Sequence, residues 1–258
     1  MALNASEAIK TAFGSLKTDV GQKLIGLFFV IQLVNIGSTV LTNMGMTALQ
    51  IAGVVLGLVA ALASIAATIG GLRSYRKDEV ERSLFTDNLL WPFIRTLGAN
   101  LTSAAFAYLL GLIFLLPAYI AVLGGVSSLA ATGSIASGLG TAGIALAAVG
   151  GILGFAVFSY VIVTLLLAQP LIAIEDKRMF QSLDESVQRT KGSRLSIFLA
   201  GLGTFLVYGI VALLLGVIGN IAGGEQAAAY AVQLLVVPIF TPVFLALLNH
   251  FTEELPLE

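Results

Sequence analysis

The sequence predicts an all-α, polytopic integral membrane protein with six transmembrane helices and both termini in the cytoplasm. Three observations support this fold class. The 258-residue chain has a mean hydropathy of +1.00, with 58% apolar and only 10% charged residues, whereas about 25% of residues are charged in soluble domains. Four long intervals contain no Asp, Glu, Lys or Arg. All thirteen Lys and Arg residues fall in three short clusters, which lie before the first, second and third intervals.

The uncharged intervals set the number of spans, because a helix needs roughly 20 residues to cross the hydrocarbon core. The intervals are residues 24–72, 96–174, 195–224 and 226–252. The first two are long enough for two spans each, and the last two for one each. The predicted spans are residues 24–43, 48–72, 97–123, 144–172, 195–218 and 227–249. They form one transmembrane domain over residues 24–252, followed by a short cytoplasmic tail at 253–258. Residues 124–143 are small and uncharged and predict an outer loop.

The basic clusters set the orientation. They lie at Lys10–Lys23, Arg73–Arg95 and Lys177–Arg194, and six spans place all three on one side of the bilayer. The positive-inside rule makes that side cytoplasmic, in a multi-pass protein of the cell membrane. Thirteen of the fourteen acidic residues share it, and Glu225 is the exception. Such a balanced surface argues against nucleic acid as a partner.

Residues 1–23 predict an amphipathic N-terminal helix. Ile9 and Phe13 belong to an apolar series at helical spacing, and Asn4 followed by Glu7 resembles a capping box. Two placements are open for this helix: flat in the inner membrane interface, or packed against the helical bundle.

Two further amphipathic segments, near 77–95 and 177–194, precede the third and fifth spans. Trp91 is suited to anchor the first at the interface, and Phe180 and Leu183 form the apolar side of the second. The candidate interfacial docking residues are Phe13, Trp91, Phe180 and Leu183.

The sequence offers little chemistry for catalysis. His250 is the single histidine, there is no cysteine, and no predicted span contains a carboxylate. Proton relays and ion pathways normally use ionisable groups inside the membrane, and a zinc site needs three or four ligands. We therefore expect no catalytic residue, no metal ligand and no cofactor, and a protein that is not an enzyme.

Amides and prolines inside the spans are the remaining candidates. The amides form either interhelical hydrogen bonds or the lining of a neutral, water-filled path. The prolines predict a bend in the sixth span, because proline removes a helical hydrogen bond. These polar or hinge positions are Gln32, Asn35, Asn100, Gln169, Gln233, Pro238 and Pro242.

The segment 168–198 has a recognisable order of residues. A span ends in proline, an acidic residue follows a short apolar run, and a serine-containing amphipathic helix leads into a basic, glycine-containing start of the next span. The residues at these places are Pro170, Glu175, Leu183, Ser186, Lys191 and Gly192. The segment resembles the six-helix membrane family related to the membrane domain of glycerophosphoryl diester phosphodiesterases and similar prokaryotic integral membrane proteins. The match covers about 30 of 258 residues, and the resemblance implies a role in the lipid phase.

Two function classes follow. The first is a non-enzymatic membrane protein that organises the membrane or acts as an accessory subunit, with bound lipid. Its partners would be membrane lipids and a second copy of the chain or another membrane protein. The alternative is a carrier or channel for a lipid or a neutral small molecule, with the amides of the spans as its path.

Overall fold

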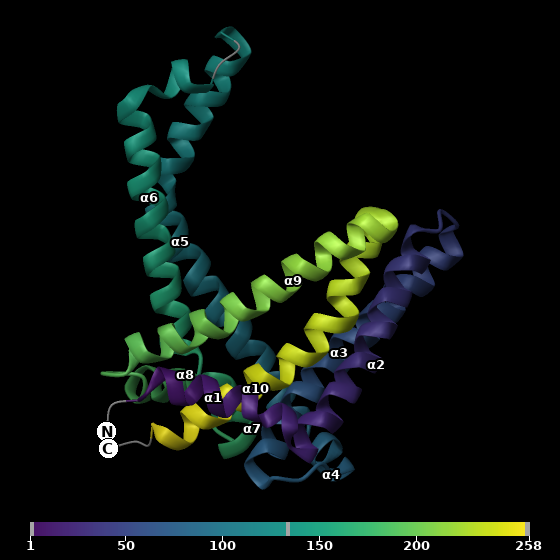
Figure 1. Ribbon diagram of the computed structural model, residues 1–258. Helices are drawn as coiled ribbons and strands as arrows, with labels where there is room; N and C mark the ends of the chain where they lie inside the picture. The colour runs from purple at the N-terminus through teal and green to yellow at the C-terminus, as the bar shows by residue number, and fades with distance from the viewer. Residues whose placement is uncertain (1–2, 133–134, 256–258) are drawn as a thin grey trace. The chain divides into compact units, whose positions relative to one another are not determined.

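The computed structural model describes the chain over residues 3–132 and 135–255. Within 111–147 it describes the side chains of only a few residues. Over the described residues the chain is helical, with no strand, which confirms the all-α prediction. It divides into two compact units (Figure 1). The larger unit comprises Met1–Leu97 and Leu167–Glu258, and the smaller unit Gly98–Leu166.

The N-terminal region contains two helices where one was expected over 1–23. In α1 (Ala5–Gly14) the side-chain oxygen of Asn4 accepts hydrogen bonds from the first-turn amides, as the capping pattern predicted. A 3-10 turn follows, and the backbone becomes extended at Thr18. The Thr18 hydroxyl accepts a hydrogen bond from the Gly21 amide at 3.1 Å and so caps α2 (Asp19–Asn43). The first long helix therefore begins five residues before the predicted span.

Helices α2 and α3 (Thr47–Lys77) form a tight hairpin. The Ser38 hydroxyl on α2 donates to the carbonyl oxygen of Gly53 on α3 at 2.7 Å. A Cβ at Gly53 would lie 2.7 Å from the backbone nitrogen of Thr42. Only glycine allows the two backbones to approach this closely.

The second amphipathic segment, expected over 77–95, consists of the short helix α4 (Arg82–Thr86) and the start of α5 (Leu90–Thr132). Helices α5 and α6 (Ile135–Leu165) supply the smaller unit. Most of the predicted outer loop 124–143 is helical, as the ends of α5 and α6. Residues 133 and 134 lie outside the described part of the chain.

The rest of the larger unit begins with two short helices, α7 (Ala168–Glu175) and α8 (Met179–Arg189). The long helix α9 (Arg194–Ala231) changes direction at Gly224, which has φ 81° and ψ −172°. A π-helical segment (Val232–Val236) then leads into α10 (Val237–Glu254). A Cβ at Gly219 would lie 2.7 Å from the Cα of Ala228, so the chain doubles back closely after Gly224.

Among the described residues there are fewer long apolar stretches than the six separate spans that the sequence predicts. The described residues contain four stretches long and apolar enough to cross a membrane: Asp19–Asn43, Thr47–Lys77, Ala148–Glu175 and Arg194–Glu254. The fifth and sixth predicted spans merge because helical structure continues through the turn at Gly224. The third predicted span, 97–123, includes residues whose side chains the structure does not describe.

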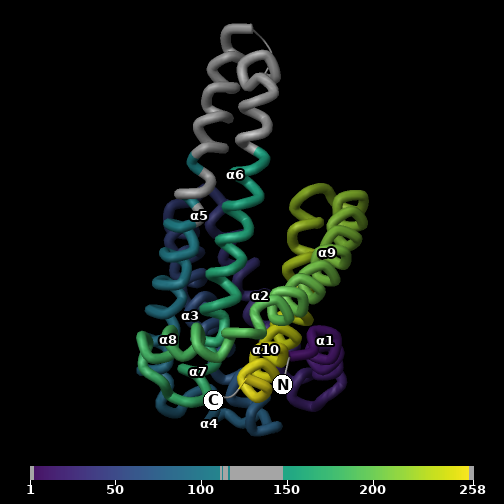
Figure 2. Tube along the Cα trace, turned by 90° about the vertical axis from the view of Figure 1, so that its left-hand side faces the viewer, coloured from purple at the N-terminus to yellow at the C-terminus, as the bar shows by residue number. Residues whose placement is uncertain are grey.

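Helix α10 forms the core of the larger unit. It contacts α1, α2 and α3, and its position against α1 is visible in both views (Figure 2). The side chains of Leu247 and Phe251 on α10 and of Leu24 on α2 are fully buried. Many large apolar side chains on α2, α3 and α9 remain exposed instead, as expected of helices that face lipid.

Candidate functional site

Arg73 joins three segments at one end of the larger unit. Its Nε donates to the carbonyl oxygen of Ala173 at 3.0 Å. Its Nη1 donates to the carbonyl oxygens of Leu84 and Asp87, at 3.3 and 3.0 Å. These carbonyls lie in or just after the last turns of α7 and α4, where helical partners run out. A cation there also interacts favourably with the helix dipoles.

Two further arginines gather acidic residues at the same end. Arg95 donates to the carboxylate of Asp176 at 2.7 Å and to its backbone carbonyl at 3.0 Å. Asp176 ends α7 in a left-handed conformation, with φ 52°. Arg76, near the end of α3, pairs with Glu253 near the end of α10 at 3.0 Å. Arg95 and Arg76 thus join the second basic cluster to the ends of α7 and α10.

Helix α8 is attached to α7 by a network of four charges. Arg189 donates to Glu175 at 2.8 Å and also to Glu185. Lys177 lies 3.1 Å from Glu185. Burial raises the pKa of the Glu185 carboxyl, but the hydrogen bonds and charges of Lys177 and Arg189 outweigh it and hold that pKa below its ordinary 4.5. The carboxylate therefore stays ionised although its side chain is only 6% exposed.

The serine of the resemblance segment has a defined packing role. The Ser186 hydroxyl is fully buried and accepts a hydrogen bond from the backbone amide of Leu167, just before α7, at 3.1 Å. Gly192 has φ 89° between α8 and α9, where a side chain would be strained. Pro170 is buried within α7. These residues place α8 against α7.

Helix α8 buries one polar side against the protein, while its apolar residues and the polar Gln181, Asp184 and Gln188 face outward. Ser182, Glu185 and Ser186 are buried, whereas Phe180 is 73% exposed and Val187 is exposed as well. Leu183 lies between them and is half-buried. At 3.6 residues per turn, the apolar residues form one exposed strip. Exposed polar residues, including Gln181 and Gln188, lie beside that strip.

The other two docking candidates have different surroundings. Trp91, in the first turn of α5, is 64% exposed, and Leu90 and Ile94 beside it are also exposed. Phe13 is half-buried and packs edge-on against Phe240 of α10, with ring centroids 5.8 Å apart. Helix α1 is therefore packed on the bundle, which was one of the two placements open from the sequence.

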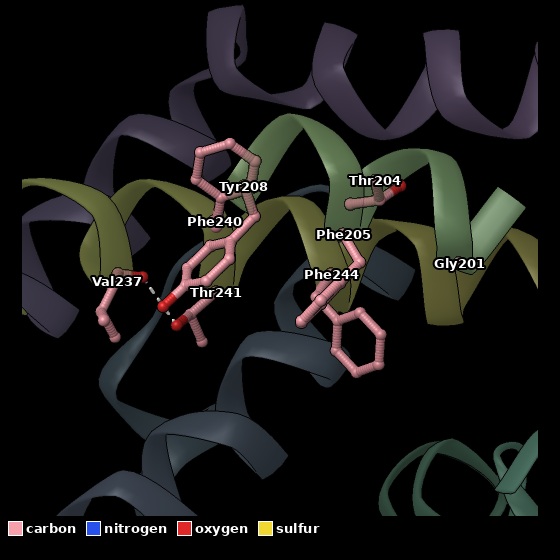
Figure 3. Close-up of a pocket in the computed structure, with 8 residues that line it drawn as sticks. All are labelled: Gly201, Thr204, Phe205, Tyr208, Val237, Phe240, Thr241 and Phe244. Atoms are coloured by element: carbon pink, nitrogen blue, oxygen red, sulfur yellow. Dashed lines mark hydrogen bonds between the residues drawn. The ribbon is translucent and has the colours of Figure 1, made fainter. Parts of the chain in front are cut away.

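A groove of about 380 Å³ lies between α9 and α10 (Figure 3). Its walls are mainly aromatic, and Tyr208 meets Phe240 edge-on at a centroid distance of 5.3 Å. The Thr241 hydroxyl is occupied by the Val237 carbonyl at 2.8 Å. The lining residues are Gly201, Thr204, Phe205, Tyr208, Val237, Phe240, Thr241 and Phe244.

The hinge candidates lie together around the π-helical segment. Pro238 is the second residue of α10, and Pro242 lies further inside that helix; both are buried. A proline cannot donate to the preceding turn, and the wider π turn accommodates this loss. The Oε1 atom of Gln233, within the π segment, is buried and has no hydrogen-bond partner among the described residues. The sequence predicted a bend in this span, and the structure has a π-helical segment there, which the sequence did not predict.

The remaining polar candidates lie on different helices. On α2, Gln32 is half-buried and Asn35 exposed. Asn100 belongs to α5 in the smaller unit, and Gln169 to the first turn of α7. These positions do not form a polar strip along any one helix.

A small polar pocket of about 230 Å³ was not predicted. His250 lines it together with Tyr75 and Glu253. The Tyr75 hydroxyl donates to Ser15 at 3.3 Å, and Asn249 donates to Glu253 at 3.1 Å. Ser15 and Tyr75 lie far in the sequence from the α10 residues of this pocket, so no local pattern could have grouped them. Within the described residues, no group of three or more His, Asp or Glu side chains is placed to hold a metal ion.

Comparison of the chain with family models, with curated proteins and with solved structures gives no match. The resemblance of residues 168–198 to the six-helix membrane family stays a prediction.

Proposed function

We propose that this protein is a non-enzymatic integral membrane protein that organises the surrounding bilayer or serves as an accessory subunit of a membrane assembly. In this proposal the chain crosses the cell membrane six times, with both termini and the charged end in the cytoplasm. The four uncharged intervals and the reversal at Gly224 support six crossings. The basic residues at the charged end support the orientation.

The inverted packing of α8 carries the proposal. An ordinary surface helix buries its apolar side and exposes its polar side. Helix α8 departs from this pattern, since Glu185 and Arg189 face the protein while Phe180 and Val187 face outward. Exposing this apolar strip to water would be unfavourable in free energy. A membrane interface would cover it and leave Gln181 and Gln188 in contact with water.

Single-cysteine labelling tests this placement, because the native chain has no cysteine. An environment-sensitive fluorophore attached to Val187→Cys is expected to shift to the blue in vesicles and to be quenched by lipids with spin labels near the head group. The same label on Gln181→Cys is the matched control and should remain in water. Equal emission and equal quenching at the two sites would contradict interfacial docking of α8.

The alternative, a carrier or channel for a lipid or neutral small molecule, is favoured by one observation. The buried Gln233 Oε1, without a partner in the described structure, lies in the π segment beside Pro238, and π turns are frequent at functional sites. Flux of lipid or neutral solute in proteoliposomes separates the two functions. The accessory function predicts that proteoliposomes leak no faster than vesicles without protein. Flux above that level that Gln233→Leu abolishes would establish the carrier.

A further inference from the structure

A second groove, of about 570 Å³, runs along α2 and α3 in the larger unit. One wall is the series Leu27, Ile31 and Val34 of α2. The opposite wall is made largely by alanines of α3, among them Ala63 and Ala67. Because alanine is short, this wall leaves a hollow where larger side chains would fill the space between the helices.

The groove has cations at one end only. Lys23, at the start of α2, and Arg82, the first residue of α4, line this end together with Phe85. Arg82 is exposed, and its guanidinium makes no ion pair with any described residue. Lys23 pairs with Asp19 at 2.7 Å, but both side chains are largely exposed, and such a pair contributes little to stability. Both cations are therefore available to an anion.

The length of the groove matches one leaflet. Residues 23 to 34 of α2 line it, a helical rise of about 16 Å. That is close to half of the roughly 30 Å hydrocarbon core. We propose that the groove binds one anionic phospholipid, with an acyl chain between α2 and α3 and the phosphate at Lys23 and Arg82. This inference rests on the proposed function only in requiring α2 and α3 to lie in a membrane.

Two carboxylates limit the affinity of this site. Glu81 lines the charged end, and its carboxylate accepts a hydrogen bond from Ser83 at 3.2 Å. Asp19 competes with a phosphate for Lys23. The groove itself carries two cations and one anion, and so favours an anionic over a zwitterionic head group.

Native mass spectrometry of the purified chain, titrated with phosphatidylglycerol or with phosphatidylcholine of the same acyl chains, tests the site. The native protein should retain one phosphatidylglycerol with an affinity about fivefold or more above that for phosphatidylcholine. Arg82→Gln should weaken the binding of phosphatidylglycerol about fivefold, since one basic group contributes on the order of 1 kcal/mol. The binding of phosphatidylcholine should not change. Glu81→Gln should raise the affinity for phosphatidylglycerol. Ala63→Phe should fill the groove and weaken retention of both lipids.

Two matched controls carry the same changes outside the groove. Ala61→Phe places the larger ring on an exposed part of α3, and Arg178→Gln removes an exposed arginine near α8. Both should bind lipid as the native protein does. Equal retention of the two lipids by the native protein, or equal losses in Arg82→Gln and Arg178→Gln, would overturn the proposal. The Arg82 comparison holds even if Ala63→Phe fails to fold. Equal retention of the two lipids by the native protein, with the fluorescence shift at Val187→Cys intact, would refute this site and leave the docking of α8 standing.

Discussion

Two helix junctions in the larger unit are built in opposite ways. Helix α8 is attached to α7 by charges, with Arg189 between Glu175 and Glu185. Helix α2 is attached to α3 by close backbone approach, with Ser38 hydrogen-bonded to the carbonyl oxygen of Gly53. The first junction stabilises through electrostatics, and the second through packing of small residues.

The difference follows from the solvent expected at each junction. Ionised groups are very costly in hydrocarbon, so α2 and α3 join through glycine, serine and dispersion contacts. At the charged end, water and neighbouring cations make ionised carboxylates tolerable. In the proposed membrane placement, helix α8 then uses Glu185 and Arg189 to contact the protein and leaves its apolar side for lipid. The two junctions should therefore respond to different perturbations.

The largest expected effect is the removal of Arg189. Arg189→Ala leaves the buried Glu185 with Lys177 as its remaining cationic partner among the described residues, and breaking one buried ion pair costs about 3 to 5 kcal/mol. We expect α8 to detach from α7. A cysteine at the buried position Ser182 should then react with a water-soluble maleimide more than about a hundredfold faster than in the native background.

Two controls define this result. A cysteine at the exposed Gln181 should react at the same rate in both backgrounds. Replacing both partners, with Glu185→Leu and Arg189→Met, should restore much of the protection of Ser182→Cys, because no unpaired charge remains. Unchanged reactivity of Ser182→Cys in Arg189→Ala would show that the charge network does not hold α8.

A smaller effect is expected at the packing junction. Gly53→Ala would bring a Cβ within 2.7 Å of the Thr42 nitrogen and 2.8 Å of the Ser38 carbonyl oxygen. Such overpacking costs about 1 to 3 kcal/mol. In an SDS titration, the variant should therefore unfold at a lower SDS concentration than the native protein. Gly26→Ala on α2 is the matched control, because a Cβ there meets nothing within 4 Å. If both variants unfold together, close packing at Gly53 does not matter for stability.

The smallest effect is that of acid on the charged junction. The pKa of Glu185 is held below 4.5 in the fold, so its contribution to stability is present above that pH and is lost as the pH falls through the folded pKa. Lys177, Arg189 and Glu175 are the charges that face it or its partners. Hydrogen exchange of residues 179–189, corrected for its intrinsic pH dependence, should be flat from pH 7 to about 5 and accelerate in stronger acid. Glu185→Gln should remove the step, and acceleration already at pH 6 would exclude Glu185 as its cause.

Local patterns in the sequence predicted much of the fold and part of the site. The cap at Asn4, the bend predicted from Pro238 and Pro242 and the apolar strip of α8 all depend on residues within a few positions of one another. Such spacing can be read without a structure. The break at Thr18 was missed because its hydroxyl can begin a new helix inside a continuous amphipathic pattern.

Hydropathy and charge spacing by themselves determined the all-helical class and the long apolar stretches, because only a helix satisfies its own backbone hydrogen bonds within one segment. The tertiary structure decided which side of α8 faces the protein, where Arg73 and Arg95 find their partners, and which helices form the lipid-sized groove. Those contacts join residues up to 100 positions apart. They depend on how helices pack, and periodicity within one helix cannot specify the side chains that another helix brings to it.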